Sequence, residues 1–485
     1  MKVESLHHIL QQECQLDCKL PVLVGVSGGP DSICLLHILT QAGYPVLIAH
    51  FNHQLRPESA HESAFVMQFA KQMNLPAISD TADVKAYAQQ KRLSIEEAAR
   101  ELRYQFLFEA ARQSGAQAVA VGHTADDQIE TALMHLLRGS GPAGLRGMRM
   151  RSLPNPWSKT IPLVRPLLAM WRVEVEAYLG THHLQFVQDA SNLDPVYYRN
   201  RLRHEALPYL QTLNPQIKQA LWQTAEIVGT DYEFLQAEVQ KLRDSNLIRS
   251  IAPGVVEIRR AEYSRLPESL QRELLRHSAF EIKPGLRDFD YEAIQRALFA
   301  LQKPAHELQV ELVSGLRLVI EHDRVWLVRQ NAKLPVDDWP QIQPEEWRLL
   351  DLNDRVELAN QWELRTEGIP CNNEVQTIAR MNRDPFQAWA DADQLTQPLV
   401  LRARQPGDKI QMLGMGGQHT KLSDLFINRK IPRRARPNWP LIVSGDMVAW
   451  APGVQLAHPV RLTETTRRVI YFSLRHRQPG PKEPK

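Results

Sequence analysis

Hydrophobic and polar residues follow two different periods in the first 140 residues of the chain. Short aliphatic runs at 22–26, 45–50 and 119–122 have the length of buried strands, whereas the apolar positions at 33–40 and 65–73 recur with helical spacing. Strands and helices in alternation form a parallel sheet that helices cover on both faces. We therefore predict a doubly wound α/β domain over residues 1–213, with ligands bound at the carboxyl ends of its strands.

The pattern changes after this domain. Between residues 214 and 302 the apolar period is helical, and two alternating segments then flank 321–323, which predicts a β-hairpin. Prolines at 335, 340 and 344 interrupt any regular element that follows. The predicted order is a mostly helical domain at 214–330, a linker at 331–344, a small α+β domain at 345–475 and a polar tail at 476–485.

The amino-acid composition excludes several classes of protein. The chain has 485 residues, of which 43% are hydrophobic and 23% charged, a balance typical of globular proteins of about three domains and unlike that of disordered chains. No apolar run approaches the roughly 20 residues of a membrane span, and no signal peptide is visible. The four cysteines do not form a disulfide framework. We expect a cytoplasmic protein with reduced thiols and no membrane contact.

Positive charge is concentrated near the C-terminus, although the net charge of the whole chain is small. The net charge is only +3, but residues 399–440 contain nine Lys or Arg against two acids. Such a patch suits a phosphate backbone, and Phe426 and Trp439 within it are candidates to stack on a base. The alternative is a basic surface that binds nothing.

A glycine-rich loop follows the first predicted strand and continues directly into a helix: Ser27-Gly28-Gly29-Pro30-Asp31-Ser32. Glycines allow an anion to approach the backbone, the two hydroxyls can donate to it, and the positive end of the helix dipole attracts it. Pro30 suits the first helical position. Because no Lys follows, this is not a Walker motif. The loop predicts phosphate binding; the alternative is a tight turn with Asp31 as a helix-start acid.

An acid beside a polyphosphate repels it unless a divalent cation lies between them. We therefore predict Mg²⁺ at Asp31.

Two further strand ends carry candidate ligands. After the strand at 119–122, Thr124 and Asp127 have capping-box spacing, and Asp126 and Glu130 lie one helical turn apart. These acids either complement the helix dipole or hold a cation or an amine. His123 is either a ligand contact or an ordinary hydrogen-bonded histidine.

The segment 50–56 follows another strand and begins with His50, Phe51, Asn52 and His53. Nucleotide contact is favoured here over zinc, because there is no HExxH pattern and no thiolate partner.

These motifs carry a family resemblance. The loop at 27–32 is similar to the pyrophosphate loop of ATP pyrophosphatases, and together with 50–56, 94–104, 122–141 and 189–204 it resembles the tRNA(Ile)-lysidine synthetase family. The chain departs from many relatives at Asn52, where they carry an acid. The resemblance implies an adenine-nucleotide-binding fold in the first domain and tRNA-binding roles for the helical and basic C-terminal domains.

The resemblance also implies a reaction. ATP, with Mg²⁺, adenylates C2 of the wobble cytidine of the isoleucine tRNA with the anticodon CAU. Free L-lysine then displaces AMP to give lysidine, so that the tRNA reads AUA as isoleucine. The candidate catalytic residues are Asp31, Asp126, Asp127 and Glu130, and the predicted ATP contacts are Ser27, Gly28, Gly29, Pro30, Asp31, Ser32, His50, Phe51, Gly122 and His123.

Basic residues are the predicted contacts to tRNA or phosphate: Arg100, Arg103, Arg199, Arg201 and Arg203, with Arg402, Arg404, Lys421, Lys430 and Arg433 in the C-terminal domain. The alternative for the first five is a solvated helix face. Two other functions stay open: a pyrophosphate-loop enzyme that thiolates tRNA, and a non-catalytic RNA-binding protein. The sequence also leaves the oligomeric state open, a homodimer included.

Overall fold

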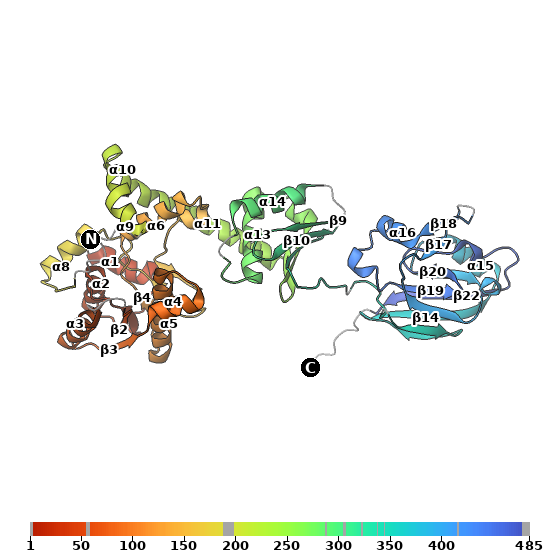
Figure 1. Ribbon diagram of the computed structural model, residues 1–485, viewed down its shortest axis with the longest axis horizontal. Helices are drawn as coiled ribbons and strands as arrows, with labels where there is room; N and C mark the ends of the chain where they lie inside the picture. Colours follow the sequence, from red (N-terminus) through yellow and green to blue (C-terminus); the bar gives the residue numbers. More distant parts are fainter. Residues whose placement is uncertain are drawn as a thin grey trace. The chain divides into compact units, whose positions relative to one another are not determined.

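The computed structural model describes residues 3–54, 59–187, 198–286, 289–303, 307–321, 324–336, 338–343, 345–414 and 417–477. It divides into two compact units, Met1–Gln236 and Ala237–Lys485, which are red to yellow-green and green to blue in Figure 1. Several predictions fall outside the described residues: those on 55–56, on 189–192, on the turn residues 322–323, on Pro344 and on the tail from 478.

The first unit is built on one six-stranded sheet with the order β3-β2-β1-β4-β6-β5. Five strands are parallel and β5 is antiparallel to β6. The strands are β1 (Val22–Gly25), β2 (Val46–Asn52), β3 (Ala77–Thr81), β4 (Ala118–Ala120), β5 (Arg151–Ser152) and β6 (Leu163–Val164). Chain order reverses between β1 and β4, which is where open α/β sheets bind ligands.

Helices cover both faces of this sheet, as predicted. Val22 and Val24 of β1 belong to one apolar core with α2 and α8, while Leu23 belongs to a second core with α5. This division follows from the alternation of side chains along a strand. The helices of the sheet layers are α1 (Val3–His8), the π-helical η1 (Ile9–Glu13), α2 (Pro30–Gln41), α3 (Ser59–Gln72), α4 (Val84–Lys91), α5 (Ile95–Ser114) and α8 (Arg172–Thr181).

A second group of helices packs on α6, whose buried Ile129 and Leu133 form a small core with Leu202 and Leu207. The group comprises α6 (Ala125–Leu137), α7 (Pro142–Leu145), α9 (Tyr198–Arg201), the π-helical η3 (Leu202–Ala206), α10 (Leu207–Leu213) and α11 (Ile217–Asp244). Leu221 of α11 joins this core, so the first part of α11 belongs to the first unit, and the boundary between the two units falls inside this helix.

The second unit begins with the helices expected in the middle region: α12 (Arg260–Tyr263), α13 (Glu268–Ile282) and α14 (Tyr291–Gln302). The predicted hairpin is confirmed by the antiparallel pairing of β10 with β11. It is part of a five-stranded sheet that the helical period did not reveal, with β7 (Ile248–Ala252), β8 (Val255–Arg259), β9 (Glu307–Glu311), β10 (Leu316–Glu321) and β11 (Arg324–Arg329) in the order β7-β8-β11-β10-β9.

The C-terminal part is α+β, as predicted. One sheet has the order β12-β16-β19-β20-β21, a second has the order β13-β14-β22-β15, and β17 pairs with β18 alone. The strands are β12 (Trp347–Leu350), β13 (Arg355–Glu357), β14 (Trp362–Pro370), β15 (Gln387–Asp391), β16 (Leu399–Ala403), β17 (Lys409–Gln411), β18 (His419–Lys421), β19 (Pro440–Ser444), β20 (Met447–Ala451), β21 (Gln455–Leu456) and β22 (Arg468–His476). The helices are α15 (Asn373–Met381) and α16 (Leu422–Asn428), with 3-10 turns η4 (Ala392–Gln394), η5 (Arg433–Ala435) and η6 (His458–Val460).

One expectation for this domain is wrong. Phe426 and Trp439 are both fully buried, at 0% exposure, and their rings pack against each other in the core. Neither ring can stack on a base, because apolar burial has already taken up both faces.

Throughout the described ranges, no helix combines the length and the apolar character that crossing a bilayer requires.

At the ligand-binding end of the first sheet, the backbone that follows β4 lies very close to the backbone of α2. Gly122 follows β4, and a Cβ atom at this position would lie 2.8 Å from the carbonyl oxygen of Asp31 and 2.9 Å from its carbonyl carbon. Only a glycine lets the end of β4 touch the first turn of α2 in this way.

We predict that Gly122→Ala lowers the free energy of unfolding by about 1–3 kcal/mol, because the new methyl meets backbone that cannot rotate away. Urea denaturation measures this change. Gly180→Ala in α8 is the matched control, since nothing lies within 4 Å of the place that its new Cβ would occupy, and it should be neutral or slightly stabilising. Equal destabilisation of both variants would contradict the steric argument.

Candidate active site

The phosphate loop connects β1 to α2 and is held by its own hydroxyls. Gly28 has φ +90°, and Gly29 caps α2, whose first residue is Pro30. The amide of Ser27 donates to Ser32 Oγ (3.2 Å), the amide of Gly29 donates to Ser27 Oγ (3.3 Å), and Ser32 Oγ donates to the Gly29 carbonyl (3.0 Å). The loop is therefore shaped before any ligand binds, with the positive end of the α2 dipole at its centre.

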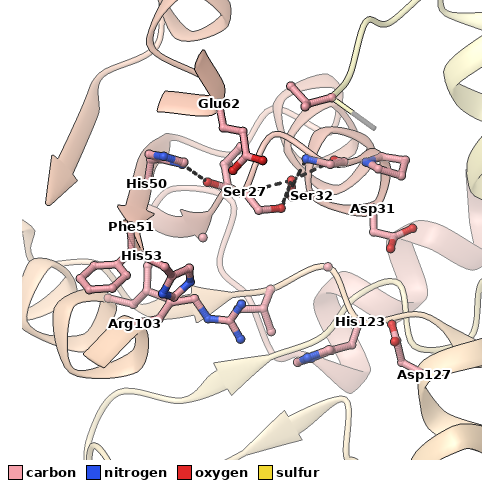
Figure 2. A pocket seen from close by; sticks show the side chains of 18 of the residues that line it. Ser27, Asp31, Ser32, His50, Phe51, His53, Glu62, Arg103, His123 and Asp127 are labelled. Carbon is pink, nitrogen blue, oxygen red and sulfur yellow. Dashed lines mark hydrogen bonds between the residues drawn. The ribbon is translucent and has the colours of Figure 1, made fainter. Parts of the chain in front are cut away.

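A pocket of about 470 Å³ opens beside this loop. Figure 2 shows Ser27 and Ser32 on one side of it and Arg103 and His123 on the opposite side. Its lining comes from the ends of β1, β2 and β4 and from α2, α3, α5, α6, α8 and α9, so segments far apart in the chain meet at the carboxyl edge of the sheet.

The end of β2 is fixed by hydrogen bonds to α3. His50 Nδ1 donates to the Val26 carbonyl (2.8 Å), because a carbonyl oxygen only accepts, and His50 Nε2 then accepts from Ser63 Oγ (2.9 Å). Burial lowers the pKa of His50, so the ring is neutral at neutral pH.

Asn52 ties the same strand end to the start of α3. Its amide nitrogen donates to Ser59 O (3.2 Å) and to Ser63 Oγ (3.0 Å), and its amide oxygen accepts from the backbone of Gln54 (2.9 Å). Asn52 therefore connects the end of β2 to the start of α3 through the hydrogen bonds of a neutral amide. This role needs no negative charge.

Asp31 is the acid with an unsatisfied oxygen. Its Oδ1 is buried without a hydrogen-bond partner among the described residues. Burial, together with the nearby charge of Asp127, raises the pKa of Asp31 to about 6, although Arg172 and Arg203 oppose the shift. A carboxylate in this position fits a divalent cation that also binds phosphate oxygens. No cluster of three or more His, Cys, Asp or Glu able to hold a metal occurs in the described part of the chain, so phosphate oxygens would have to complete the coordination.

Three more polar groups of the pocket have buried atoms without a partner in the described structure: His53 Nδ1, Arg103 Nε and His123 Nδ1. Burial and the charge of Arg103 lower the pKa of His53 to about 4. Burial and neighbouring guanidinium groups, Arg165 foremost, hold the pKa of His123 well below its ordinary value. Both rings are neutral at neutral pH, and each offers a hydrogen bond to a polar ligand.

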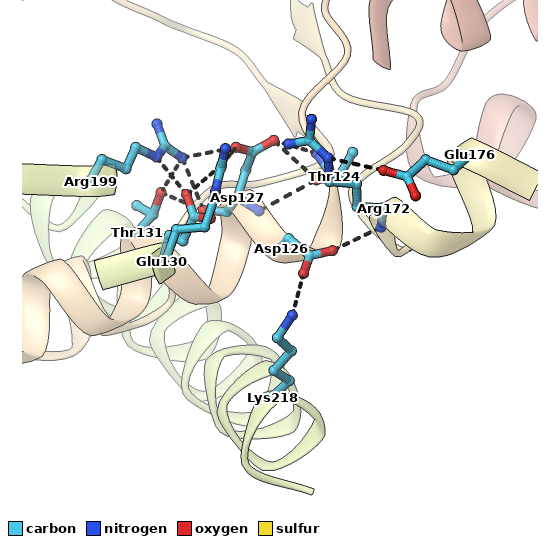
Figure 3. A network of polar contacts seen from close by, with 10 residues as sticks. Thr124, Asp126, Asp127, Glu130, Thr131, Arg172, Glu176, Arg199 and Lys218 are labelled. Carbon is cyan, nitrogen blue, oxygen red and sulfur yellow. Dashed lines mark hydrogen bonds and ion pairs between the residues drawn. The ribbon is translucent and has the colours of Figure 1, made fainter. Parts of the chain in front are cut away.

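The carboxylates at the start of α6 form a network, drawn in Figure 3. Thr124 and Asp127 make the predicted capping box. Asp126 accepts from the backbone amide of Arg172 and from Lys218 Nζ, at 2.8 and 2.9 Å. Asp126 thus joins the starts of α8 and α11 to α6, and it does not line the pocket.

Glu130 lies deeper, with its side chain only 1% exposed, between two arginines. Its carboxylate accepts from Arg199 Nε (2.9 Å) and from Arg203 Nε and Nη2 (2.6 and 3.0 Å). Both guanidinium groups border the pocket, and Asp127 lies 3.3 Å from Arg199 Nη2. Glu130 therefore positions two cations that face the ligand, and it is not itself exposed to the ligand.

Most of the predicted site residues line the pocket. It is lined by all the predicted ATP contacts except Gly28, by Asp31 and Asp127 among the candidate catalytic acids, and by Arg103, Arg199 and Arg203 among the basic residues. Arg100 instead covers the ring of Tyr104 (4.8 Å), and Arg201 is exposed beside Glu205. Glu62 and Arg172 also line the pocket, but no motif marks them, because each stands at an ordinary polar position of a helix.

The basic residues of the C-terminal domain divide into structural and exposed ones. Arg402 makes two hydrogen bonds to Asp408, at 2.9 and 2.8 Å, and Arg404 lies over the Phe426 ring at 5.9 Å. Lys421, Lys430 and Arg433 are exposed. The second group therefore offers its charge at the surface, whereas the first supports the fold.

A phosphate loop at the topological switch point of a parallel sheet defines an ATP-binding domain of the pyrophosphate-loop class, and the pattern described as a PP-loop domain matches residues 3–210. The pattern described as the TilS substrate C-terminal domain matches residues 399–470.

Whole-chain relatives are more specific. A tRNA(Ile)-lysidine synthase of Dehalococcoides mccartyi is 34% identical over 98% of this chain and 99% of its own length. A tRNA(Ile)-lysidine synthase of Geobacter sulfurreducens is 35% identical over 94% and 93%. Among solved structures, a TilS C-terminal domain aligns with 28% of this chain and 98% of that chain, at 24% identity and a TM-score of 0.25. The chain belongs to the tRNA(Ile)-lysidine synthase family, which confirms the resemblance.

The raised pKa of Asp31 predicts a pH-dependent penalty on folding. Between the ordinary value of 3.8 and about 6, the folded protein holds a proton that the unfolded chain has released, so this group makes stability fall as pH rises through that window. In the ligand-free protein, Asp31→Asn should therefore match the wild type at pH 3.5 and exceed its free energy of unfolding by about 1–3 kcal/mol at pH 7. Urea denaturation of both proteins across this pH range tests the prediction. A difference in the free energy of unfolding that does not change with pH would show that folding does not raise the pKa of Asp31.

Removing the charge of Glu130 should be strongly destabilising, because two partly buried guanidinium groups lose their closest carboxylate and keep only the longer contacts to Asp127 at 3.3–3.5 Å. We expect Glu130→Gln to lower the free energy of unfolding by about 3 kcal/mol. The control is Glu205→Gln, whose carboxylate is exposed and 3.7 Å from Arg201, and which should change stability by less than about 0.5 kcal/mol. Similar small effects in both variants would refute a structural role for Glu130.

Proposed function

We propose that this protein ligates free L-lysine to C2 of the wobble cytidine of the isoleucine tRNA with the anticodon CAU, in two steps, at the pocket beside the phosphate loop. Membership of the tRNA(Ile)-lysidine synthase family over nearly the whole chain carries the proposal. The pocket supports it independently, because the preformed phosphate loop lines one cavity together with four residues that each have a buried polar atom without a partner in the described structure.

In the first step, the cytidine O2 attacks the α-phosphorus of ATP and pyrophosphate leaves. The amides at the start of α2 would bind the polyphosphate, and Arg103, Arg199 and Arg203 would neutralise charge that develops on it. Asp31 would hold Mg²⁺, whose chemistry is to neutralise and orient the phosphate oxygens. The neutral rings of His53 and His123 would donate hydrogen bonds without adding charge.

In the second step, the ε-nitrogen of lysine forms a bond to C2 while the bond from C2 to the AMP oxygen breaks, and the amine must lose a proton. Of the three acids on α6, Asp127 alone lines the pocket. Its carboxylate caps α6 and lies 3.3 Å from Arg199 Nη2 and 3.5 Å from Arg203 Nη2, so two cations flank the group that faces the ligand. We therefore assign the lysine ammonium to Asp127, which would orient it and accept its proton directly or through water.

The two alternative functions have less support. A thiolating enzyme needs a reactive sulfur, but no cysteine lines the described pocket, and burial raises the pKa of the Cys34 thiol in α2 to about 12. A purely RNA-binding protein has no need of buried, unpartnered groups around a phosphate loop. We further propose that the enzyme acts in the cytoplasm.

The decisive measurement is ATP-dependent incorporation of labelled lysine into tRNA. We expect label in the CAU tRNA with Mg-ATP, and none when the wobble cytidine is replaced by uridine. Asp127→Asn should reduce kcat by about 100-fold or more if the carboxylate accepts the proton, and the exposed Asp231→Asn should leave kcat unchanged. Absence of label with all substrates present would refute the function.

A further inference from the structure

Arg172 lines the pocket, but the proposed mechanism gives it no task. It is the first residue of α8 and shares the pocket wall with Asp31 and the phosphate loop. A cation in the first turn of a helix lies at the positive end of the helix dipole, which is electrostatically unfavourable. The stability of α8 therefore does not explain an arginine at this position.

The charge of Arg172 is less compensated than that of the arginines on the other side of α6. Arg199 and Arg203 share the buried carboxylate of Glu130. Among the described residues, the carboxylate that pairs with the Arg172 guanidinium is that of Glu176, which is 59% exposed and 3.5 Å away. Such an exposed ion pair contributes little. The guanidinium of Arg172 is therefore available to an anion in the pocket.

The position of Arg172 favours the β- and γ-phosphates of ATP as this anion. Figure 2 shows Asp31 at one end of the pocket and Phe51 with His53 at the other, where an apolar ring suits the base. Burial and the charge of Asp127 raise the pKa of Asp31 to about 6, and Arg172 is the foremost of the charges that oppose this shift. Arg172 thus acts on the Asp31 end, and a guanidinium matches phosphate oxygens in a bidentate geometry.

Asp126 fixes the backbone that carries this guanidinium. Its Oδ2 accepts from the amide of Arg172 (2.8 Å), which has no partner within α8, and its Oδ1 accepts from Lys218 Nζ (2.9 Å). The amide of the adjacent Ala125 donates to the Met170 carbonyl (2.9 Å). The start of α8 is therefore connected to the start of α6 in both directions, and through Lys218 to the start of α11 (Figure 3).

We propose that Arg172 binds the β- and γ-phosphates of ATP, and that Asp126, held by Lys218, is the positioning residue that keeps Arg172 beside them. When the cytidine oxygen bonds to the α-phosphorus, the bond from that phosphorus to the bridging oxygen breaks and its electron pair leaves with pyrophosphate. Arg172 would stabilise this charge and transfers no proton. The proposal rests on the proposed function, because it takes pyrophosphate as the leaving group.

Binding of the two halves of ATP to the full-length protein tests the role of Arg172. In the presence of Mg²⁺, Arg172→Met should raise the Kd of pyrophosphate about tenfold or more and leave the Kd of AMP unchanged. Arg172→Lys should recover only part of the affinity, since an ammonium keeps the charge but lacks the planar fork. The control is Arg112→Met, which removes an exposed arginine paired with Glu109 on α5 and should change neither Kd.

A double-mutant cycle tests the role of Asp126. Asp126→Ala should raise the Kd of pyrophosphate about threefold in the wild-type background and should have no further effect in Arg172→Met, because it acts through that residue. Asp126→Asn, whose amide oxygen can still accept from the amide of Arg172, should have a smaller effect, and it allows the same comparison if the alanine variant does not fold.

Four results would overturn the proposal: no binding of pyrophosphate to the wild type, wild-type affinity for pyrophosphate in Arg172→Met, an equal loss of AMP affinity in that variant, or a full effect of Asp126→Ala when Arg172 is already absent. These measurements use neither lysine nor tRNA. Failure of the proposed function is therefore distinguishable, because the protein would then bind pyrophosphate through Arg172 without incorporating lysine.

Discussion

The whole site depends on one close contact between backbones. The end of β4 touches the first turn of α2 through Gly122, and this contact places the start of α6 beside the phosphate loop. Two helix N-termini therefore face one pocket, and both favour negative charge there. The acids of α6 reach the ligand-binding edge only because the strands that precede α2 and α6 are neighbours in the sheet.

Compensation of charge determines which of the polar residues can act on a ligand. Around α6, Asp126 pairs with Lys218 and Glu130 is buried between Arg199 and Arg203. Asp127 caps its own helix and lies at 3.3–3.5 Å from the same two arginines, but it lines the pocket. Asp31 keeps a buried oxygen that no described residue pairs, and its pKa is raised accordingly. Burial and neighbouring charges thus decide which of these carboxylates stabilise the fold and which can act on a ligand, as is usual for functional carboxylates.

The sequence was sufficient to predict the α/β domain, the phosphate loop and the acidic helix start, because each depends on local order: a strand, a turn residue and a cap. It was insufficient where long-range packing decides. The apolar period of the middle region did not reveal β7, β8 and β9, since short strands and helix segments look alike in such a pattern. Phe426 and Trp439 looked available for stacking, yet they fill the core. Arg172 and Glu62 carried no motif, since only the fold brings them to the pocket.

Asn52 shows how a departure from relatives can be accommodated. Its amide donates twice, to Ser59 and Ser63, and accepts once, from Gln54. An aspartate has the same shape but no donors, so it would keep the bond accepted from Gln54 and lose both donated bonds. It would gain a bond from Ser63 only if that hydroxyl gave up its bond to His50. In this family, exchange of amide for acid at this position should therefore be accompanied by compensating change at position 63. The two positions form a coupled pair, which would drift together through evolution while the junction of β2 and α3 keeps its geometry.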